Sequence, residues 1–599
     1  MSEIAISLRS QTATMANLFN RRVNSLKGCK DYCDTLSRLN IQEAVKCALT
    51  ILGEGEHKAA GVDGSMELDE VLELLIFYVC AAGYHATFKI TQDMVSFNLE
   101  DVNKIPGLSV SAAVPLWEED LPNIVETAQA ELDPDLRRSR ERIPFALMTM
   151  AELEIALQLV RSRIFKIIFL DRPLSGTYPA LSRDASALLR RGRSSLIGLE
   201  TKAGKLRFTD IYIAAGLGPG ELWIPPRGGN LTYAAIKALT GKFDATMGSL
   251  GQILSLSNSE LKRLWRRLQD LNSRLGGELF DIEGEKIRLR DENLSYWNRV
   301  IDASSLVTSK IFKEPRHPLI DCEGRWLNIL DLNTINLFLL YALIHEACEN
   351  NILLVGIAKD TVATEYTRSV LPFILTSKGV ERDSESVELN SDRAFLTVLS
   401  AVNHEVLKPP WRTASYDACF TTLIWNPKGE VKLRSARKVV SREQLFVRSY
   451  FQLRSFTSDP SIRSPVFLYD RPFNPKIDKT VMDVEVEERG GKTVLKPFIE
   501  LDRVSMIDNL ILYILSLSDN AEVMEAYGHN HLLYLADKYV KEEVEQMKGL
   551  LKGVVELELT PLARREKVFT VARRFRDLRA ESERMRKRHG RTARMGESL

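Results

Sequence analysis

The chain has 599 residues, a formal net charge of +1 and a hydrophobic fraction of 45%. This composition excludes collagen-like and low-complexity proteins, because 33 Gly and 22 Pro are too few for either class. The length predicts roughly four domain-sized units. Because 81 basic residues balance 80 acidic ones, any nucleic-acid-binding surface has to be local.

Cysteine usage and hydropathy indicate the compartment. The seven cysteines are scattered, only Cys29 and Cys33 are close together, and no Cys/His set has the spacing of a zinc site. The first 22 residues lack the apolar run of a signal peptide, and the most apolar stretches, 337–344 and 510–517, are shorter than the roughly 20 residues that span a bilayer. We therefore expect a cytoplasmic protein that does not enter a membrane.

The N-terminal region predicts helices followed by strands. Apolar residues recur at helical spacing within 1–52, so we expect residues 1–54 to form an N-terminal helical arm. The segment HKAAGVDGS (57–65) predicts a strand that ends in a turn at Asp63. Residues 72–82 are apolar enough for a strand or a buried helix. The alternating segments 85–91 and 94–100 resemble strands.

A helix and a short strand follow. The segment 144–163 has helical composition, and Pro144 suits the first helical position, where the missing N–H has no helical partner. KIIFLD (166–171) directly follows, and its apolar run predicts a buried strand with Asp171 at its carboxyl end.

The second half repeats this alternation after an irregular region. Residues 181–320 contain several Gly and Pro residues around short apolar runs and a polar helix at 257–275, so we interpret them as an insertion. A helix at 332–350 and a buried strand at 351–361 come next, which is typical of α/β proteins.

The C-terminal region contains strands, then helices, then a basic tail. Residues 440–500 hold three strand-like stretches, and 504–518 and 530–556 read as helices. The last 39 residues carry 13 Lys or Arg against five Asp or Glu. We expect residues 557–599 to form a solvated basic helical tail.

Three acidic residues occur in an order typical of RNase H-like enzymes. Asp63 follows a first strand, Glu152 or Glu154 lies in a later helix, and Asp171 ends the next strand. Phosphodiester hydrolysis needs hard cations such as Mg²⁺ or Mn²⁺, which prefer oxygen ligands. Two such ions about 3.5 to 4 Å apart stabilise the entering and leaving oxygens. These acids therefore predict a metal site.

The helix itself favours Glu152 over Glu154 as the ligand. At about 100° per residue, Glu152 projects into an apolar sector, whereas Glu154 falls on the polar side beside Gln158 and Arg161. A carboxylate that faces the core needs a partner, either a metal ion or an arginine. Glu154 remains the substitute ligand.

These segments together resemble the NurA nucleases. Their first motif, a strand that ends in Asp-Gly-Ser, is similar to GVDGS at 61–65, and their LLDGSL-like strand is similar to FLDRPL at 169–174. Glu152 matches the helix glutamate by its place four residues before an alanine. VGIAKDT at 355–361 is similar to a later strand that carries a lysine, here Lys359. GHNHLLYLADKY (528–539) loosely resembles the family's last motif.

The resemblance implies a metal-dependent DNA nuclease on an RNase H-like mixed sheet flanked by helices, formed by residues 55–180 and 321–556. Asp63, Glu152 or Glu154, Asp171 and Asp537 would hold two Mn²⁺ or Mg²⁺ ions. Asp537, in the place of the family's terminal histidine, or His531 would orient the attacking water. Lys359 would bind DNA. The resemblance also implies a homodimer that acts with a HerA-type hexameric ATPase in DNA end resection and double-strand break repair.

Other interpretations remain open from the sequence. Arg172 and Pro173 replace the family's small pair and the terminal histidine is missing, which favours a non-catalytic DNA-end adaptor or regulatory subunit on the same scaffold. A Piwi-like guide-dependent nuclease would share the scaffold, but the sequence has no separate guide-binding signature. An isolated Asp-Gly-Ser is most often only a turn. Asp470 lies in a second Asp-Arg-Pro, which we interpret as coincidence because its flanks differ.

Overall fold

The computed structural model describes most of the chain, and its described residues group into two compact units, 1–541 and 542–599. The described ranges are 3–71, 74–117, 120–125, 136–220, 230–241, 245–321, 324–380, 391–425, 431–433, 446–474, 477–478, 484–488, 491–495, 497–501 and 505–565. Of the expected basic tail at 557–599, residues 566–599 lie outside these ranges.

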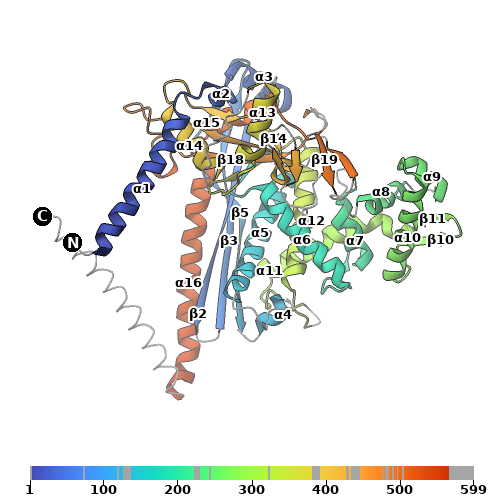
Figure 1. Ribbon diagram of the computed structural model, residues 1–599. Coiled ribbons are helices and arrows are strands. Elements are labelled where there is room, and N and C mark those ends of the chain that lie inside the picture. The colour runs from blue at the N-terminus through green and yellow to red at the C-terminus, as the bar shows by residue number, and fades with distance from the viewer. Residues whose placement is uncertain are drawn as a thin grey trace. The chain divides into compact units, whose positions relative to one another are not determined.

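A large mixed sheet forms the centre of the first unit (Figure 1). Its strand order is β1-β13-β17-β18-β12-β6-β2-β3-β4, with β14 also paired to β17 and β5 to β3. The strands β2, β6 and β12 are mutually parallel, and the other pairs are antiparallel. Their bounds are β1 Leu36–Arg38, β2 Gly55–Val71, β3 Leu74–Ile90, β4 Val95–Phe97, β5 Asn103–Trp117, β6 Phe165–Leu170, β12 Leu353–Ala358, β13 Trp411–Thr413, β14 Tyr416–Asp417, β17 Phe446–Gln452 and β18 Phe467–Pro472.

Helices cover both faces of this sheet. One face carries α5 (Leu136–Ser162), α6 (Leu174–Arg191) and α12 (Ile329–Glu349), and the other carries α3 (Ile41–Ile51), α15 (Met506–Leu517) and the first turns of α16 (His531–Arg565). Successive side chains of a strand point to opposite faces. Ile168 and Leu170 of β6 accordingly lie in the core under α5, while Ile167 and Phe169 lie in the core with α15.

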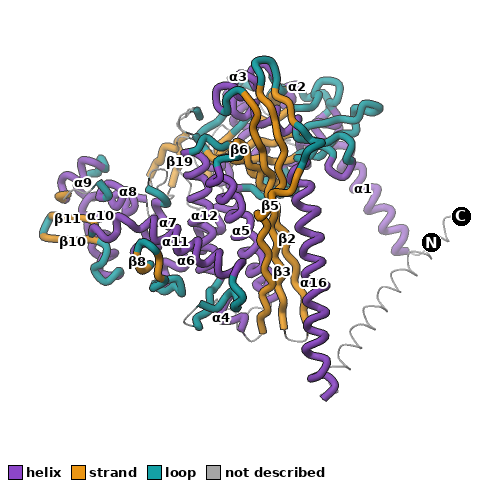
Figure 2. Tube along the Cα trace, turned by 180° about the vertical axis from the view of Figure 1, so that it is seen from behind, coloured by secondary structure: helices purple, strands orange, loops and turns teal. Residues whose placement is uncertain are grey.

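Residues 181–320 are mainly helical and extend the core on the α12 side of the sheet (Figure 2). The helices are α7 (Phe208–Leu217), α8 (Asn230–Leu239), α9 (Met247–Ile253), α10 (Asn258–Arg274) and α11 (Tyr296–Lys313). The short strands are β7 (Glu200–Thr201), β8 (Gly204–Lys205), β9 (Ala245–Thr246), β10 (Phe280–Glu283) and β11 (Lys286–Leu289). The polar helix expected at 257–275 is α10, whose N-terminus is capped by the Ser257 side chain and Glu260.

A further core lies around β13 and β17 and includes residues of α1 (Glu3–Leu26), α2 (Lys30–Cys33), α13 (Leu371–Ser377) and α14 (Asp392–Val402). The short helix α4 (Leu121–Val125) packs instead on α5. Two hairpins complete the described structure, formed by β15 (Leu423–Trp425) with β16 (Val431–Leu433) and by β19 (Val484–Glu488) with β20 (Gly491–Leu495).

Three elements differ from the sequence expectations. The N-terminal segment contains β1, which pairs with β13 at an edge of the main sheet. Helix α5 begins at Leu136, so Pro144 lies inside it; the helix continues upstream because Ile143 packs fully buried in the same core as Leu147. Strand β2 passes straight through Asp63, because β3 continues to pair with it as far as Val71. The Asp-Gly-Ser segment is therefore extended and not a turn.

Two core helices have the length and composition of membrane spans. Residues 141–162 of α5 and 329–349 of α12 reach mean hydropathies of 1.5 and 1.2. In this structure 78% and 83% of these windows are buried inside the protein. Their apolarity is explained by packing, because α12 lies between α5, α6 and the sheet.

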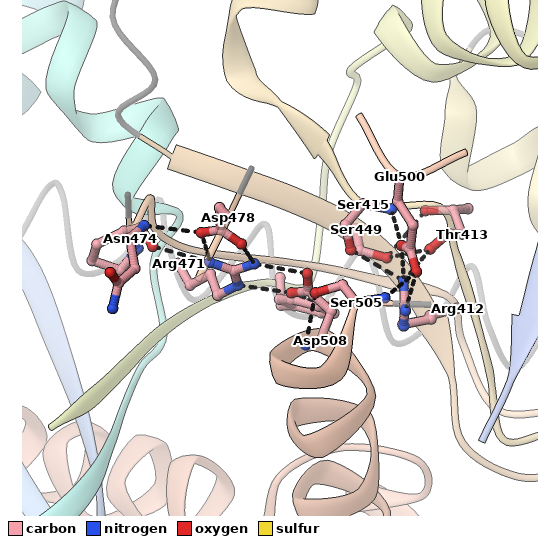
Figure 3. A network of polar contacts seen from close by, with 12 residues as sticks. Arg412, Thr413, Ser415, Ser449, Arg471, Asn474, Asp478, Glu500, Ser505 and Asp508 are labelled. Carbon is pink, nitrogen blue, oxygen red and sulfur yellow. Dashed lines mark hydrogen bonds and ion pairs between the residues drawn. The ribbon is translucent and has the colours of Figure 1, made fainter. Parts of the chain in front are cut away.

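A buried network of ion pairs holds β13, β18 and α15 together (Figure 3). Arg471 contacts Asp478 at 2.7 Å and Asp508 at 2.8 Å, and all three side chains are at most 1% exposed. Arg412 contacts Glu500 at 2.6 Å. Each guanidinium meets carboxylates in bidentate fashion, so the buried charges in this network are compensated.

Candidate active site

Two aspartates lie side by side where the parallel strand β6 ends. Val62 of β2 pairs with Leu170 of β6, and the backbone N–H of Asp171 donates to the Val62 carbonyl at 3.1 Å. Asp63 and Asp171 are the next residues on the two strands. Parallel pairing therefore brings together two carboxylates that are far apart in the sequence.

The pleat directs Asp63 toward the face that carries α16. Ala60 and Val62 lie in the core under α5, so the residues between and after them point to the other face. Gly61 confirms this direction, because a Cβ at this position would lie 2.7 Å from Cβ of Leu532 in α16. The start of α16 thus packs directly against β2 next to Asp63.

Asp63 is buried, and its carboxyl group lacks full compensation. Burial raises the pKa of Asp63, the charges of Asp171 and Glu152 raise this pKa further, and Lys359 lowers it. Oδ1 accepts the Gly64 N–H at 2.7 Å, whereas the buried Oδ2 accepts no N–H or O–H from the described residues. The carboxylates of Asp63 and Asp171 repel each other when both are charged. The pair therefore needs a proton or a cation.

Lys359 places a positive charge beside this pair. It follows β12, the strand parallel to β6, and forms an ion pair with Oδ2 of Asp171. Burial alone would lower the pKa of Lys359, but Asp171, Asp63 and Asp537 more than offset this and raise the pKa. Lys359 is therefore protonated at neutral pH.

The segment around the start of α16 contributes Asp537 and His529 to the same neighbourhood. Asp537 pairs with Lys541 at 2.8 Å and acts electrostatically on both Lys359 and His529. Burial and Lys359 lower the pKa of His529 to about 4, so this imidazole is neutral at pH 7. Both ring nitrogens of His529 lack hydrogen-bond partners among the described residues.

His531 lies outside this charged group. Its ring stacks on Tyr534 with centroids 6.0 Å apart, and burial alone lowers the pKa of His531. Of the two histidines in this motif, His529 and not His531 interacts with Lys359 and Asp171.

Glu152 reaches the site from α5 and pairs with Arg172. Its side chain is 2% exposed and contacts Nε of Arg172. The guanidinium also donates to Oγ1 of Thr149 at 2.8 Å and lies over the Phe145 ring, 5.5 Å from its centroid. Burial raises the pKa of Glu152, and Arg172 lowers it.

The glycine of the Asp-Gly-Ser segment makes this approach possible. A Cβ at Gly64 would lie 2.6 Å from Oε1 of Glu152 and 2.9 Å from Cγ of Met148. Glycine at 64 leaves the space that the Glu152 side chain occupies. Glu154 faces elsewhere: it accepts from Gln158 at 2.8 Å and raises the pKa of Arg161.

The donor set fits a hard cation at one position but not as a complete cage. Asp63 and Asp171 offer adjacent carboxylates with an uncompensated buried oxygen, which suits Mg²⁺ or Mn²⁺. Glu152 is turned to Arg172. Accordingly, within the described ranges no three His, Cys, Asp or Glu side chains are arranged to hold a metal ion.

Sequence reasoning left open whether Glu152 meets a metal ion or an arginine, and the structure identifies the partner as Arg172. Sequence reasoning missed the role of the second Asp-Arg-Pro. Asp470 accepts the backbone N–H groups of Leu174 and Ser175 at 3.0 and 2.8 Å, so it caps the N-terminus of α6 immediately after Arg172. The repeated Asp-Arg-Pro triplet was the sequence feature that could have revealed this contact. Both copies lie beside Gly356, where an added Cβ would be 2.5 Å from the Arg172 carbonyl oxygen and 2.5 Å from Oδ1 of Asp470.

Comparisons with known proteins find weak structural matches only. No family model and no curated protein matches the sequence. The NurA nuclease from Sulfolobus solfataricus is 11% identical, with 93% of this chain and 98% of that chain covered and a TM-score of 0.37. NurA with manganese is 10% identical (92% and 98% covered, TM-score 0.35), and NurA bound to dAMP and manganese is 11% identical (90% and 94%, 0.30). Values at this level assign the chain to no family, so its function has to be argued from its own residues.

Proposed function

We propose that this chain is a divalent-metal-dependent deoxyribonuclease of the NurA type, built on an RNase H-like core. The observation that carries this proposal is the buried pair of Asp63 and Asp171 on adjacent parallel strands, with one carboxylate oxygen of Asp63 left uncompensated by the described residues. The antiparallel strands β2, β3 and β5, followed by β6 and β12 parallel to β2, support the RNase H-like part of the proposal.

Each residue of the site has a role in this proposal. Asp63 and Asp171 hold the divalent ion, which would neutralise the phosphodiester and activate water when bound. Lys359 contacts a phosphate oxygen as a point charge. Asp537 orients the attacking water, because it shares the neighbourhood of Lys359 and Asp171, whereas His531 stacks on Tyr534. Glu152 adds a negative charge near Asp63 from the side of α5, and Glu154 has no role in the proposed site.

The direct test is Asp63→Asn in the full chain, assayed for Mn²⁺-dependent degradation of linear DNA. We expect activity to fall at least about 100-fold, because the amide removes the negative charge that binds the ion. Asp69→Asn is the matched control on the same strand, since the Asp69 side chain accepts the N–H of the neighbouring Glu70 and has no role in the proposed site. Unchanged activity of Asp63→Asn would remove the proposed site.

A second candidate, a non-catalytic DNA-end adaptor, is favoured by one observation. Arg172 and Lys359 already pair with Glu152 and Asp171, as expected of a site in which protein cations have replaced metal ions. Calorimetric titration with Mn²⁺ separates the two functions. A nuclease binds Mn²⁺ in a manner that Asp171→Ala abolishes, whereas an adaptor shows no such binding.

The resemblance to NurA nucleases extends the proposal to partners and pathway. We propose that the chain forms a homodimer, lacks its own motor and works with a HerA-type hexameric ATPase that feeds duplex ends for resection in double-strand break repair. The described cysteines form no disulfide, including the close pair Cys29 and Cys33, which supports a reducing cytoplasm. Co-purification with a hexameric ATPase, and duplex degradation that depends on both proteins and ATP, would test the partnership.

A further inference from the structure

Arg172 is a buried cation beside the proposed site, on the side of the sheet that carries α5. Arg172 directly follows the proposed ligand Asp171 in the sequence, and the Arg172 side chain is 7% exposed. Three groups fix the guanidinium: the Glu152 carboxylate, the Thr149 hydroxyl and the face of Phe145. An arginine stays charged at any pH a protein experiences. The positive charge beside Glu152 is therefore permanent.

Glu152 belongs electrostatically to the same group as the two aspartates. Its charge raises the pKa of Asp63, and Asp171 in turn raises the pKa of Glu152. Its Oε1 occupies the space that glycine leaves at position 64, next to Asp63. A second divalent ion bound by these carboxylates would need the Glu152 oxygens. The Glu152 carboxylate is already paired with Arg172.

Formal charge counting supports a site with one ion. The pair of Asp537 and Lys541 is neutral as a whole, and the three carboxylates Asp63, Asp171 and Glu152 together with Arg172 and Lys359 leave one net negative charge. One divalent ion changes this to one net positive charge, which a single phosphodiester neutralises. A second ion would leave two uncompensated positive charges in a largely buried site, and uncompensated buried charge is costly.

We propose that this site takes one divalent ion, at Asp63 and Asp171, and that Arg172 held by Glu152 supplies the positive charge that a second ion provides in two-ion sites. This inference rests on the proposed nuclease function and replaces the two ions expected from the sequence. Arg172 is then a positioning and charge-supplying residue, and Glu152 anchors it without contacting the ion.

The experiment is a Mn²⁺ titration of the full chain by calorimetry, with bound Mn²⁺ counted independently by electron paramagnetic resonance. We expect about one ion per chain for the wild type, about two for Arg172→Ala, in which Glu152 is freed, and none for Asp63→Asn. The matched control is Arg161→Ala. It removes an exposed arginine near the C-terminal end of α5 that pairs with Glu346 at 2.7 Å, and this variant should keep one ion.

A second variant covers the case in which Arg172→Ala fails to fold. Glu152→Gln should still bind one ion, because Glu152 does not contact the ion in this proposal. Two ions on the wild type, or loss of the single ion in Glu152→Gln, would overturn the one-ion site and leave the nuclease function standing. No ion on the wild type would overturn both, which makes the two failures distinguishable.

Discussion

Of two copies of Asp-Arg-Pro, residues 171–173 directly follow β6 and residues 470–472 end β18, and the polar contacts of the two copies differ. In the second copy, Asp470 receives two backbone N–H groups and the Ser175 hydroxyl, and Arg471 meets two carboxylates, Asp478 and Asp508 (Figure 3). In the first copy, Asp171 pairs with a lysine that is 32% exposed, and Arg172 meets one carboxylate.

The difference separates a structural network from a functional one. Around Arg471, both oxygens of Asp478 and both oxygens of Asp508 accept hydrogen bonds, so their burial needs no further donor. Near Arg172, the buried Oδ2 of Asp63 has no donor among the described residues. A buried charged group without a hydrogen-bond or ion-pair partner costs free energy, and a bound proton or cation would reduce this cost. The proposed cation at Asp63 and Asp171 would supply the partner that Oδ2 of Asp63 lacks.

The strongest test of this contrast removes each arginine in turn. Arg471→Ala should lower the free energy of unfolding by about 3 to 5 kcal/mol, because it leaves Asp478 and Asp508 buried without a counter-ion. Arg172→Ala should also destabilise the protein in EDTA, but added Mn²⁺ should restore stability, since Glu152 then gains a cation. Denaturant unfolding with EDTA and with Mn²⁺ measures both effects.

The contrast would fail in either of two ways. Recovery of Arg471→Ala by Mn²⁺ would show that the second network also binds ions. An Arg172→Ala protein that Mn²⁺ stabilises no more than the wild type would show that Glu152 does not accept a metal when freed. Ca²⁺ is a useful comparison ion, because it also prefers oxygen ligands but is larger and takes more of them.

Replacing either of two glycines by alanine should lower stability by less than Arg471→Ala does, and the two new methyl groups meet different atoms. Gly356 separates the two triplets, and Gly356→Ala should cost about 1 to 3 kcal/mol, since the new methyl group meets the Arg172 carbonyl, which is backbone and cannot rotate away. Gly64→Ala meets the flexible ends of Glu152 and Met148, so we expect a smaller loss of stability. Thermal unfolding of both variants measures the ranking, and the reverse order would contradict it.

The sequence could predict the strands that carry the site but not their extent. Short apolar runs at 166–171 and 351–361 predicted buried strands, and β6 and β12 confirm them; the structure adds that these two strands are parallel. The turn at Asp63 was wrong, because local Asp-Gly preference is outweighed by continued pairing with β3. The start of α5 was also wrong, since packing of Ile143 outweighs the hydrogen bond that Pro144 cannot make.

Helical periodicity predicted that Glu152 and Glu154 point in different directions, whereas the residues that they contact depend on tertiary structure. About 100° per residue separates Glu152 from Glu154, and the structure indeed turns only Glu152 toward Asp63. That Glu152 meets Arg172 could not be read from the sequence, because the pair is 20 residues apart and forms only where the end of β6 passes α5. The catalytic roles of these residues remain predictions.

The smallest predicted effect is on the pH dependence of stability. Asp63 has a raised pKa in the folded state, so between the ordinary carboxyl pKa of about 4 and this raised value the unfolded state binds fewer protons. Stability must therefore fall as pH rises through that window. In EDTA, Asp63→Asn should remove this fall and gain stability relative to the wild type by up to about 1 kcal/mol per pH unit within the window.

Asp508 in the saturated network should show the opposite sign. Arg471 and its hydrogen bonds hold the pKa of Asp508 well below its usual range, so its contribution is present above about pH 4 and is lost as the pH falls below that value. Asp508→Asn should accordingly destabilise the protein most at neutral pH, and less in acid. Unfolding free energies measured between pH 3 and 8 compare the two variants. A difference between Asp63→Asn and wild type that does not change with pH would mean that Asp63 is already compensated, which would remove the electrostatic reason for a cation at this site.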